Sequence, residues 1–72
     1  MNSQTKDRNK ADRKAMTLIR QAKAERDAKG YRENLGYDAQ NKLEAFMDTL
    51  PALQYRDRAE IIAHFYRACE SI

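Results

Sequence analysis

The stretch RENLGYDAQNKLEAFMDTL, residues 32–50, decides the fold that this chain is expected to adopt. At its start, Tyr31, Leu35 and Tyr37 share one alternating frame, opposite Arg32, Asn34 and Gly36, which predicts a short strand. Its remainder repeats apolar residues at the spacing of one helix face: Leu43, Phe46, Met47 and Leu50. A strand therefore precedes an amphipathic helix, which Asp38 is placed to cap and Pro51 to end.

A second amphipathic helix follows after a short connection. Asp57 and Glu60 stand three residues apart, as in a capping box at the start of a helix. Apolar residues then repeat the same helical spacing: Ile62, Phe65, Tyr66 and Cys69. A chain of 72 residues forms one domain at most. The apolar face of this second helix is wide for one short helix to cover. We therefore expect a homodimer to complete the core.

Positive charge is concentrated in the first half of the chain. Residues 1–32 contain ten Lys/Arg and four acids, a balance of 10 − 4 = +6, whereas residues 33–72 contain four and seven, a balance of 4 − 7 = −3. Residues 1–9 lack periodicity and are expected to form a disordered tip. Strong helix formers fill residues 10–30, which predicts a basic helix or arm ending at Gly30. Such an arm suits a polyanion or an acidic protein surface.

The residue inventory argues against catalysis and against a metal or a membrane. Cys69 is the single cysteine and His64 the single histidine, so a disulfide within the chain is excluded and a Cys/His metal site lacks ligands. No spacing of carboxylates or nucleophiles indicates an active site, so we expect no enzyme activity, cofactor or small-molecule substrate. No apolar run reaches the roughly 20 residues that span a bilayer, and the N-terminus lacks a signal-peptide stretch. We expect a cytoplasmic protein without a membrane partner.

Residues 31–70 resemble the ribbon-helix-helix family of Arc/MetJ-type repressors. Two motifs carry the resemblance: RDRAEII at 56–62, which is similar to the opening of that family's second helix, and KGYR at 29–32, which is similar to its basic entry. The resemblance implies a homodimer whose paired strands enter the major groove of double-stranded DNA, over a core of two helices per chain. Residues 31–72 would then form the dimerisation and DNA-binding domain.

The resemblance also implies a role for particular residues. One face of the strand would contact bases through Arg32, Asn34 and Gly36. The start of the second helix would contact phosphates through Arg56 and Arg58. Apart from the resemblance, the charge of the basic arm predicts phosphate contacts through Lys29, Lys10, Arg13, Lys14 and Arg20. The dimer core would contain Leu35, Tyr37, Leu43, Phe46, Met47, Leu50, Ile62, Phe65, Tyr66 and Cys69. The implied function is sequence-specific repression of transcription, or another regulatory role on plasmid or phage DNA.

Two other interpretations stay open. If residues 31–37 form a loop or continue a helix, the chain is an all-α three-helix protein. It would then act as a small protein-interaction module, such as a phage-type inhibitor or an adaptor. A third interpretation, RNA binding by the basic helix, is weakened by the scarcity of aromatic residues in that half. The conformation of residues 32–37 separates the ribbon from the three-helix protein.

Overall fold

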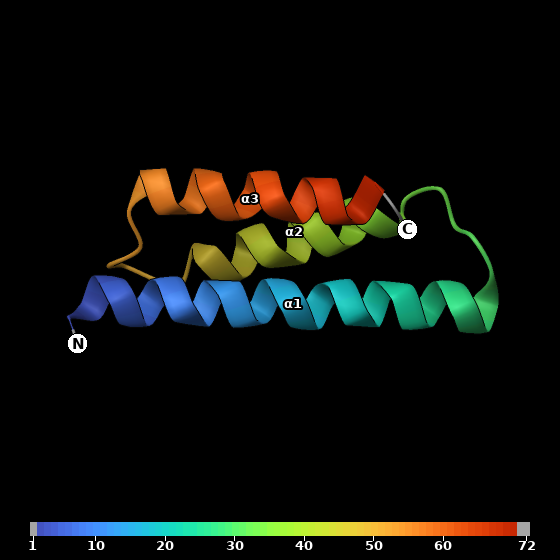
Figure 1. Cartoon of the computed structure of the whole chain (residues 1–72), viewed down its shortest axis with the longest axis horizontal. Coiled ribbons are helices and arrows are strands. Elements are labelled where there is room, and N and C mark those ends of the chain that lie inside the picture. Colours follow the sequence, from blue (N-terminus) through green and yellow to red (C-terminus); the bar gives the residue numbers. More distant parts are fainter. Residues whose placement is uncertain (1, 71–72) are drawn as a thin grey trace.

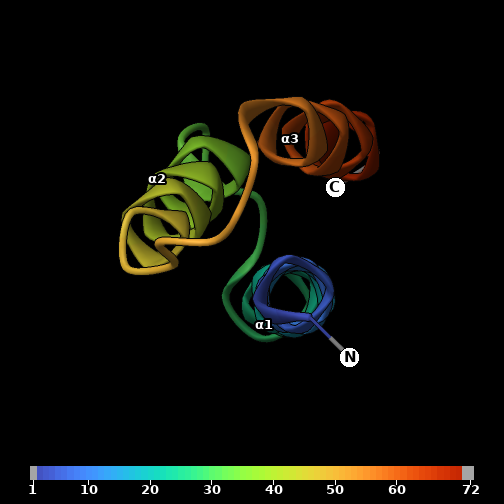
Figure 2. The same ribbon diagram turned by 90° about the vertical axis from the view of Figure 1, so that its left-hand side faces the viewer.

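The computed structural model describes residues 2–70 and contains three α-helices in that range (Figure 1). α1 spans Ser3–Lys29, α2 spans Leu35–Met47 and α3 spans Tyr55–Glu70. Successive helices run in opposite directions, and seen end-on they form a triangle in which each helix packs against the other two (Figure 2). The described chain is mainly helical, and its architecture is that of the three-helix alternative.

The strand expected over residues 32–37 is not formed. Residues 33–34 make a turn, and α2 begins at Leu35, so that Gly36 and Tyr37 lie in its first helical turn. The physical reason is burial, because Leu35 opens a line of buried side chains spaced four residues apart: Leu35, Ala39, Leu43 and Met47. A helix buries this whole line on one face, whereas a strand would bury two residues of the stretch. The described chain therefore does not show the strand that the ribbon prediction requires.

α1 begins at Ser3, so residues 3–9, which were expected to be disordered, are helical. Asn2 caps this helix, because its side-chain oxygen accepts a hydrogen bond from the Thr5 N–H at 2.8 Å. Residue 1 of the expected tip lies outside the described residues, as do residues 71–72 of the expected DNA-binding domain.

The other end of α1 is as expected. The helix ends at Lys29, and Gly30 follows with φ 84° and ψ 176°, a backbone region open to glycine. The Gly30 N–H still donates to the Arg26 carbonyl at 2.8 Å, which closes the last turn. Residues 30–34 then reverse the chain into α2.

One chain buries its own core. α1 contributes Leu18 and three small side chains that let the helices approach closely: Ala11, Ala15 and Ala22. Four residues expected in a dimer core are buried here by the chain's own helices: Leu35, Leu43, Met47 and Phe65. Four more are partly buried: Phe46, Leu50, Ile62 and Cys69. Tyr37 and Tyr66 are instead 67% and 55% exposed, so the core of the single chain does not use them.

Candidate nucleic-acid interface

The side of α1 that faces away from the bundle is lined by cations. The buried residues of α1 recur every three or four positions along one face. Helical geometry places five exposed basic residues on and around the opposite face: Lys6, Lys10, Arg13, Arg20 and Lys23. We call this set the basic face of α1. It forms because the apolar stripe of α1 is narrow, so most of the helix circumference is left for charge.

The cations of the basic face form an extended row. Lys6, Arg13 and Arg20 are seven residues apart, which places them almost in line at intervals of about 10 Å. Lys10 and Lys23 flank this line, and the whole set extends over about 26 Å of helix. The grooves of B-DNA are roughly 6 and 12 Å wide, so cations at this interval can reach phosphates on both sides of a groove.

The basic face is not neutralised by the protein itself. Across residues 2–70, none of its five cations forms an ion pair with a carboxylate. Of the two exposed acids on α1, Asp27 pairs with Arg26 at 3.1 Å, and Asp12 lines a groove toward α3 beside His64. The positive field of this face is therefore directed at solvent and is available to a polyanion.

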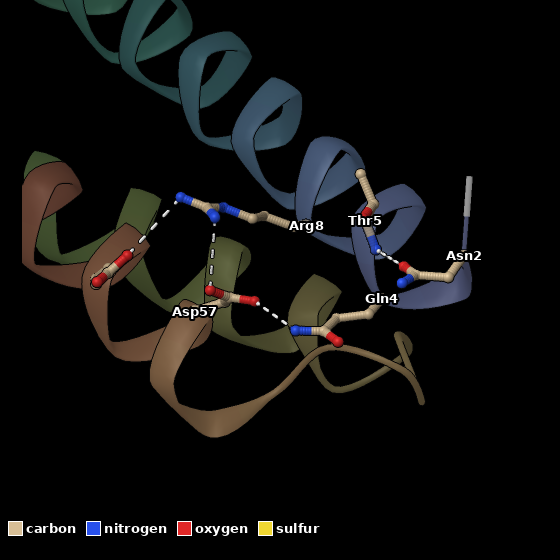
Figure 3. Close-up of polar contacts among 6 residues, drawn as sticks. Asn2, Gln4, Thr5, Arg8 and Asp57 are labelled. Carbon is tan, nitrogen blue, oxygen red and sulfur yellow. Dashed lines mark hydrogen bonds and ion pairs between the residues drawn. The ribbon is translucent and has the colours of Figure 1, made fainter.

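Other cations of the basic half are engaged inside the fold. Arg8 approaches Asp57 at 3.7 Å and Glu60 at 3.8 Å, tying α1 to α3 (Figure 3). The Lys14 ammonium lies 5.5 Å from the ring centroid of Phe46, a cation–π contact between α1 and α2. These side chains contribute to helix packing. Lys14, which was expected to contact phosphate, therefore does not belong to the basic face.

The three residues expected to contact bases do not share a face. Arg32 pairs with Glu25 at 3.2 Å and with Asp38 at 3.1 Å, so it bridges α1 and α2. Asn34 is an exposed turn residue. Gly36 lies against α3, where a Cβ on it would stand 3.0 Å from the Cβ of Cys69. Because the strand is absent from the described chain, the alternation that grouped these residues has no structural basis.

The six expected phosphate contacts other than Lys14 are divided among three places. Lys10, Arg13 and Arg20 meet on the basic face, while exposed Lys29 ends α1. The remaining two lie on α3, where Arg56 is exposed and Arg58 pairs with Asp48 at 2.7 Å. Sequence reasoning missed Lys6 and Lys23. The seven-residue spacing of Lys6, Arg13 and Arg20 was a usable signal, but it requires that residues 3–9 be helical.

Two carboxylates are buried where the N-terminal end of α1 meets the loop between α2 and α3. Asp7 is 8% exposed, and its Oδ2 accepts a hydrogen bond from the Ala52 N–H at 2.9 Å. Asp57 is 9% exposed and lies near Arg8 (Figure 3). The Gln4 amide nitrogen donates to the Asp57 Oδ2 at 3.5 Å. Both carboxylates have polar partners within the protein that account for their burial, so we assign them a structural role.

Reactive and metal-binding groups are sparse in the described part of the chain. Burial raises the pKa of the Cys69 thiol, which keeps it protonated and weakly nucleophilic at neutral pH. Among residues 2–70 no group of three His, Cys, Asp or Glu side chains is placed to hold a metal ion. None of the three helices is long and apolar enough to cross a membrane.

The basic face of α1 places five cations on one side of the described chain without ion-pair partners. No protein-family model, characterised protein or solved structure matches this chain. The geometry of its own residues therefore carries what is proposed below.

Proposed function

We propose that this chain is a three-helix protein that binds double-stranded DNA through the basic face of α1. The observation that carries the proposal is the row of five solvent-directed cations that make no ion pair within residues 2–70. Such a row attracts the phosphate backbone, which supplies most of the affinity in binding that does not depend on sequence. The net charge of +3 favours the same class of partner.

The proposed binding contacts phosphates and does not read bases. A strand pair in the major groove would have supplied sequence preference, and residues 32–37 offer no strand for it. The basic face presents long, flexible Lys and Arg side chains on one convex helix, which suits point contacts to phosphates. We favour DNA over single-stranded RNA because an aromatic stacking platform is lacking among the five residues of the face.

Salt dependence gives the proposal a quantitative form. Five phosphate contacts predict that log K falls with log salt at a slope of about −4.5. Raising salt fourfold, from about 50 to about 200 mM, then weakens binding roughly five-hundred-fold. Competition by unrelated duplexes should be equal at equal length, since the contacts carry no base information.

The test is fluorescence anisotropy of a labelled duplex of arbitrary sequence, titrated at several salt concentrations. Replacing Arg13 and Arg20 by Ala should lower the steepness of the salt slope by about two and weaken binding to every sequence alike. Lys42→Ala with Arg67→Ala removes the same charge from exposed sites on α2 and α3, and should change the slope much less. Equal losses for the two double variants would show that net charge, and not the basic face, governs binding.

A protein-interaction module is the second candidate, and a separate surface favours it. Tyr37, Tyr55 and Tyr66 are 67%, 86% and 55% exposed, and they border grooves formed by α2 and α3. Exposed tyrosines are enriched at protein–protein contacts. If a protein partner is the main ligand, Tyr66→Ala should abolish its binding while the Arg13/Arg20 variant retains it.

A further inference from the structure

The outward side of α3 carries a regular line of exposed residues. Its members are spaced alternately three and four residues apart, as in a helix–helix seam, and all are exposed: Arg56, Ala59, Ala63, Tyr66 and Glu70. We call them the outer line of α3. The residues of α3 that face α1 and α2 are Asp57, Ile61 and Phe65, on the other side of the helix. The outer line is therefore an unpartnered seam.

We infer that the outer line of α3 pairs with the same line of a second copy of this chain. The two helices would run antiparallel about a twofold axis at Ala63. An interface between identical chains of this kind must be self-complementary, since each residue meets the counterpart of its own partner. The outer line satisfies this condition in both charge and size.

Charge is complementary at the two ends of the line. Arg56 and Glu70 are each seven residues from Ala63, so the antiparallel pairing sets Arg56 of one copy level with Glu70 of the second copy. Symmetry creates this contact twice. Neither side chain forms an ion pair within residues 2–70 of its own chain, so both are available. A parallel pairing would instead oppose like charges at both ends, which is unfavourable.

Size is complementary between the ends. Ala59 and Tyr66 lie four and three residues from the axis, so a small side chain of one copy meets a large one of the second copy. At the axis, Ala63 meets Ala63, which allows the helix backbones to approach closely. A groove of about 580 Å³ beside the line, between α2 and α3, is bordered by Tyr55 and Ile62 and gives an incoming Tyr66 room to pack.

This pairing is independent of DNA binding, because no member of the outer line belongs to the basic face of α1. The line runs over 15 residues of one helix, a rise of about 21 Å, which is short for a protein interface. We therefore place the dimer in the weak, small-interface class, in equilibrium with the monomer at micromolar concentrations.

Sedimentation equilibrium of the full chain without DNA, from about 5 µM to about 1 mM, tests the pairing. Arg56→Glu and Glu70→Arg, each alone, should raise the dissociation constant of the dimer roughly tenfold, because each opposes like charges twice. The variant carrying both changes should recover the original constant. Lys42→Glu makes the same charge change as Arg56→Glu on exposed α2 and should leave the constant unchanged.

Ala63→Arg supplies a steric check, because it sets two charged side chains at the axis and should leave the chain monomeric. All of these positions are exposed, and circular dichroism should show that each variant keeps its helices. A wild-type chain that stays monomeric over the whole range overturns the inference. So does a dimer that persists in Ala63→Arg, or one in which the double charge reversal fails to restore what the single reversals remove.

Discussion

A buried carboxylate of α1 holds the loop that joins α2 to α3, whereas exposed ion pairs hold the loop that joins α1 to α2. At the first junction, Asp7 accepts a hydrogen bond from the N–H of Ala52, 45 positions away. At the second, the guanidinium of Arg32 meets Glu25 and Asp38 at 3.2 and 3.1 Å, with about half of its side chain exposed. The distances are similar, but water competes more strongly at the second junction, where the ion pairs are more exposed. The first junction should therefore depend more on a single side chain.

The largest effect is expected from Asp7→Ala, which leaves the N–H of Ala52 without its acceptor. Such a loss costs about 2 kcal/mol, or a drop of roughly 10 °C in Tm for a domain of this size. Thermal unfolding followed by circular dichroism measures it. Asp7→Asn retains a side-chain oxygen and should lose less, and Asp12→Ala removes an exposed carboxylate from the same helix as a control. Equal Tm values for Asp7→Ala and Asp12→Ala would mean that the buried bond contributes no stability.

A smaller loss is expected from Gly30→Ala at the other junction. Gly30 has φ 84° and ψ 176°, a region that side-chain-bearing residues avoid at a cost of about 1 kcal/mol or more. A Cβ at this position would meet no atom within 4 Å, so the loss isolates the backbone. Because this region is not the left-handed helical one that asparagine tolerates, Gly30→Asn should be no better than Gly30→Ala. A clear rescue by asparagine would show that the loop relaxes to a different turn.

The two junctions also show which features could be predicted from the sequence. The end of α1 at Gly30 and the presence of amphipathic helices at α2 and α3 follow from the local sequence. The start of α2 was missed because three alternating residues were read as a strand, although Leu35 also begins the line that continues at Ala39. Asp7 could not be identified at all, since its partner is a backbone N–H from a distant loop.

The candidate site could also be predicted only in part, because tertiary contacts are not visible in the sequence. The excess of positive charge and three members of the basic face, Lys10, Arg13 and Arg20, came from composition. Which cations would remain unpaired depends on tertiary contacts, such as that of Lys14 with Phe46. Tyr66 is a similar case. Helical spacing shows that it lies near the apolar face, but only tertiary packing determines whether its side chain is buried or exposed.

The smallest effect is expected from Arg32→Ala. Its two exposed ion pairs together should contribute about 0.5 kcal/mol at low salt, and the difference from wild type should vanish as salt rises. Chemical denaturation with urea at two salt concentrations measures it, since urea adds no charge of its own. A salt-independent loss comparable to that of Asp7→Ala would remove the distinction between the two junctions.

The bond between Asp7 and Ala52 also sets an order of events during synthesis. Gln4, Asp7 and Arg8 leave the ribosome long before residues 52–60, yet that later segment contains their partners. Until then the first turns of α1 have the Asn2 cap but lack these tertiary contacts. Its surface suits the delay, because a helix rich in charge and alanine exposes little that would aggregate in a nascent chain. The like charges along the exposed side of α1 oppose association of such chains.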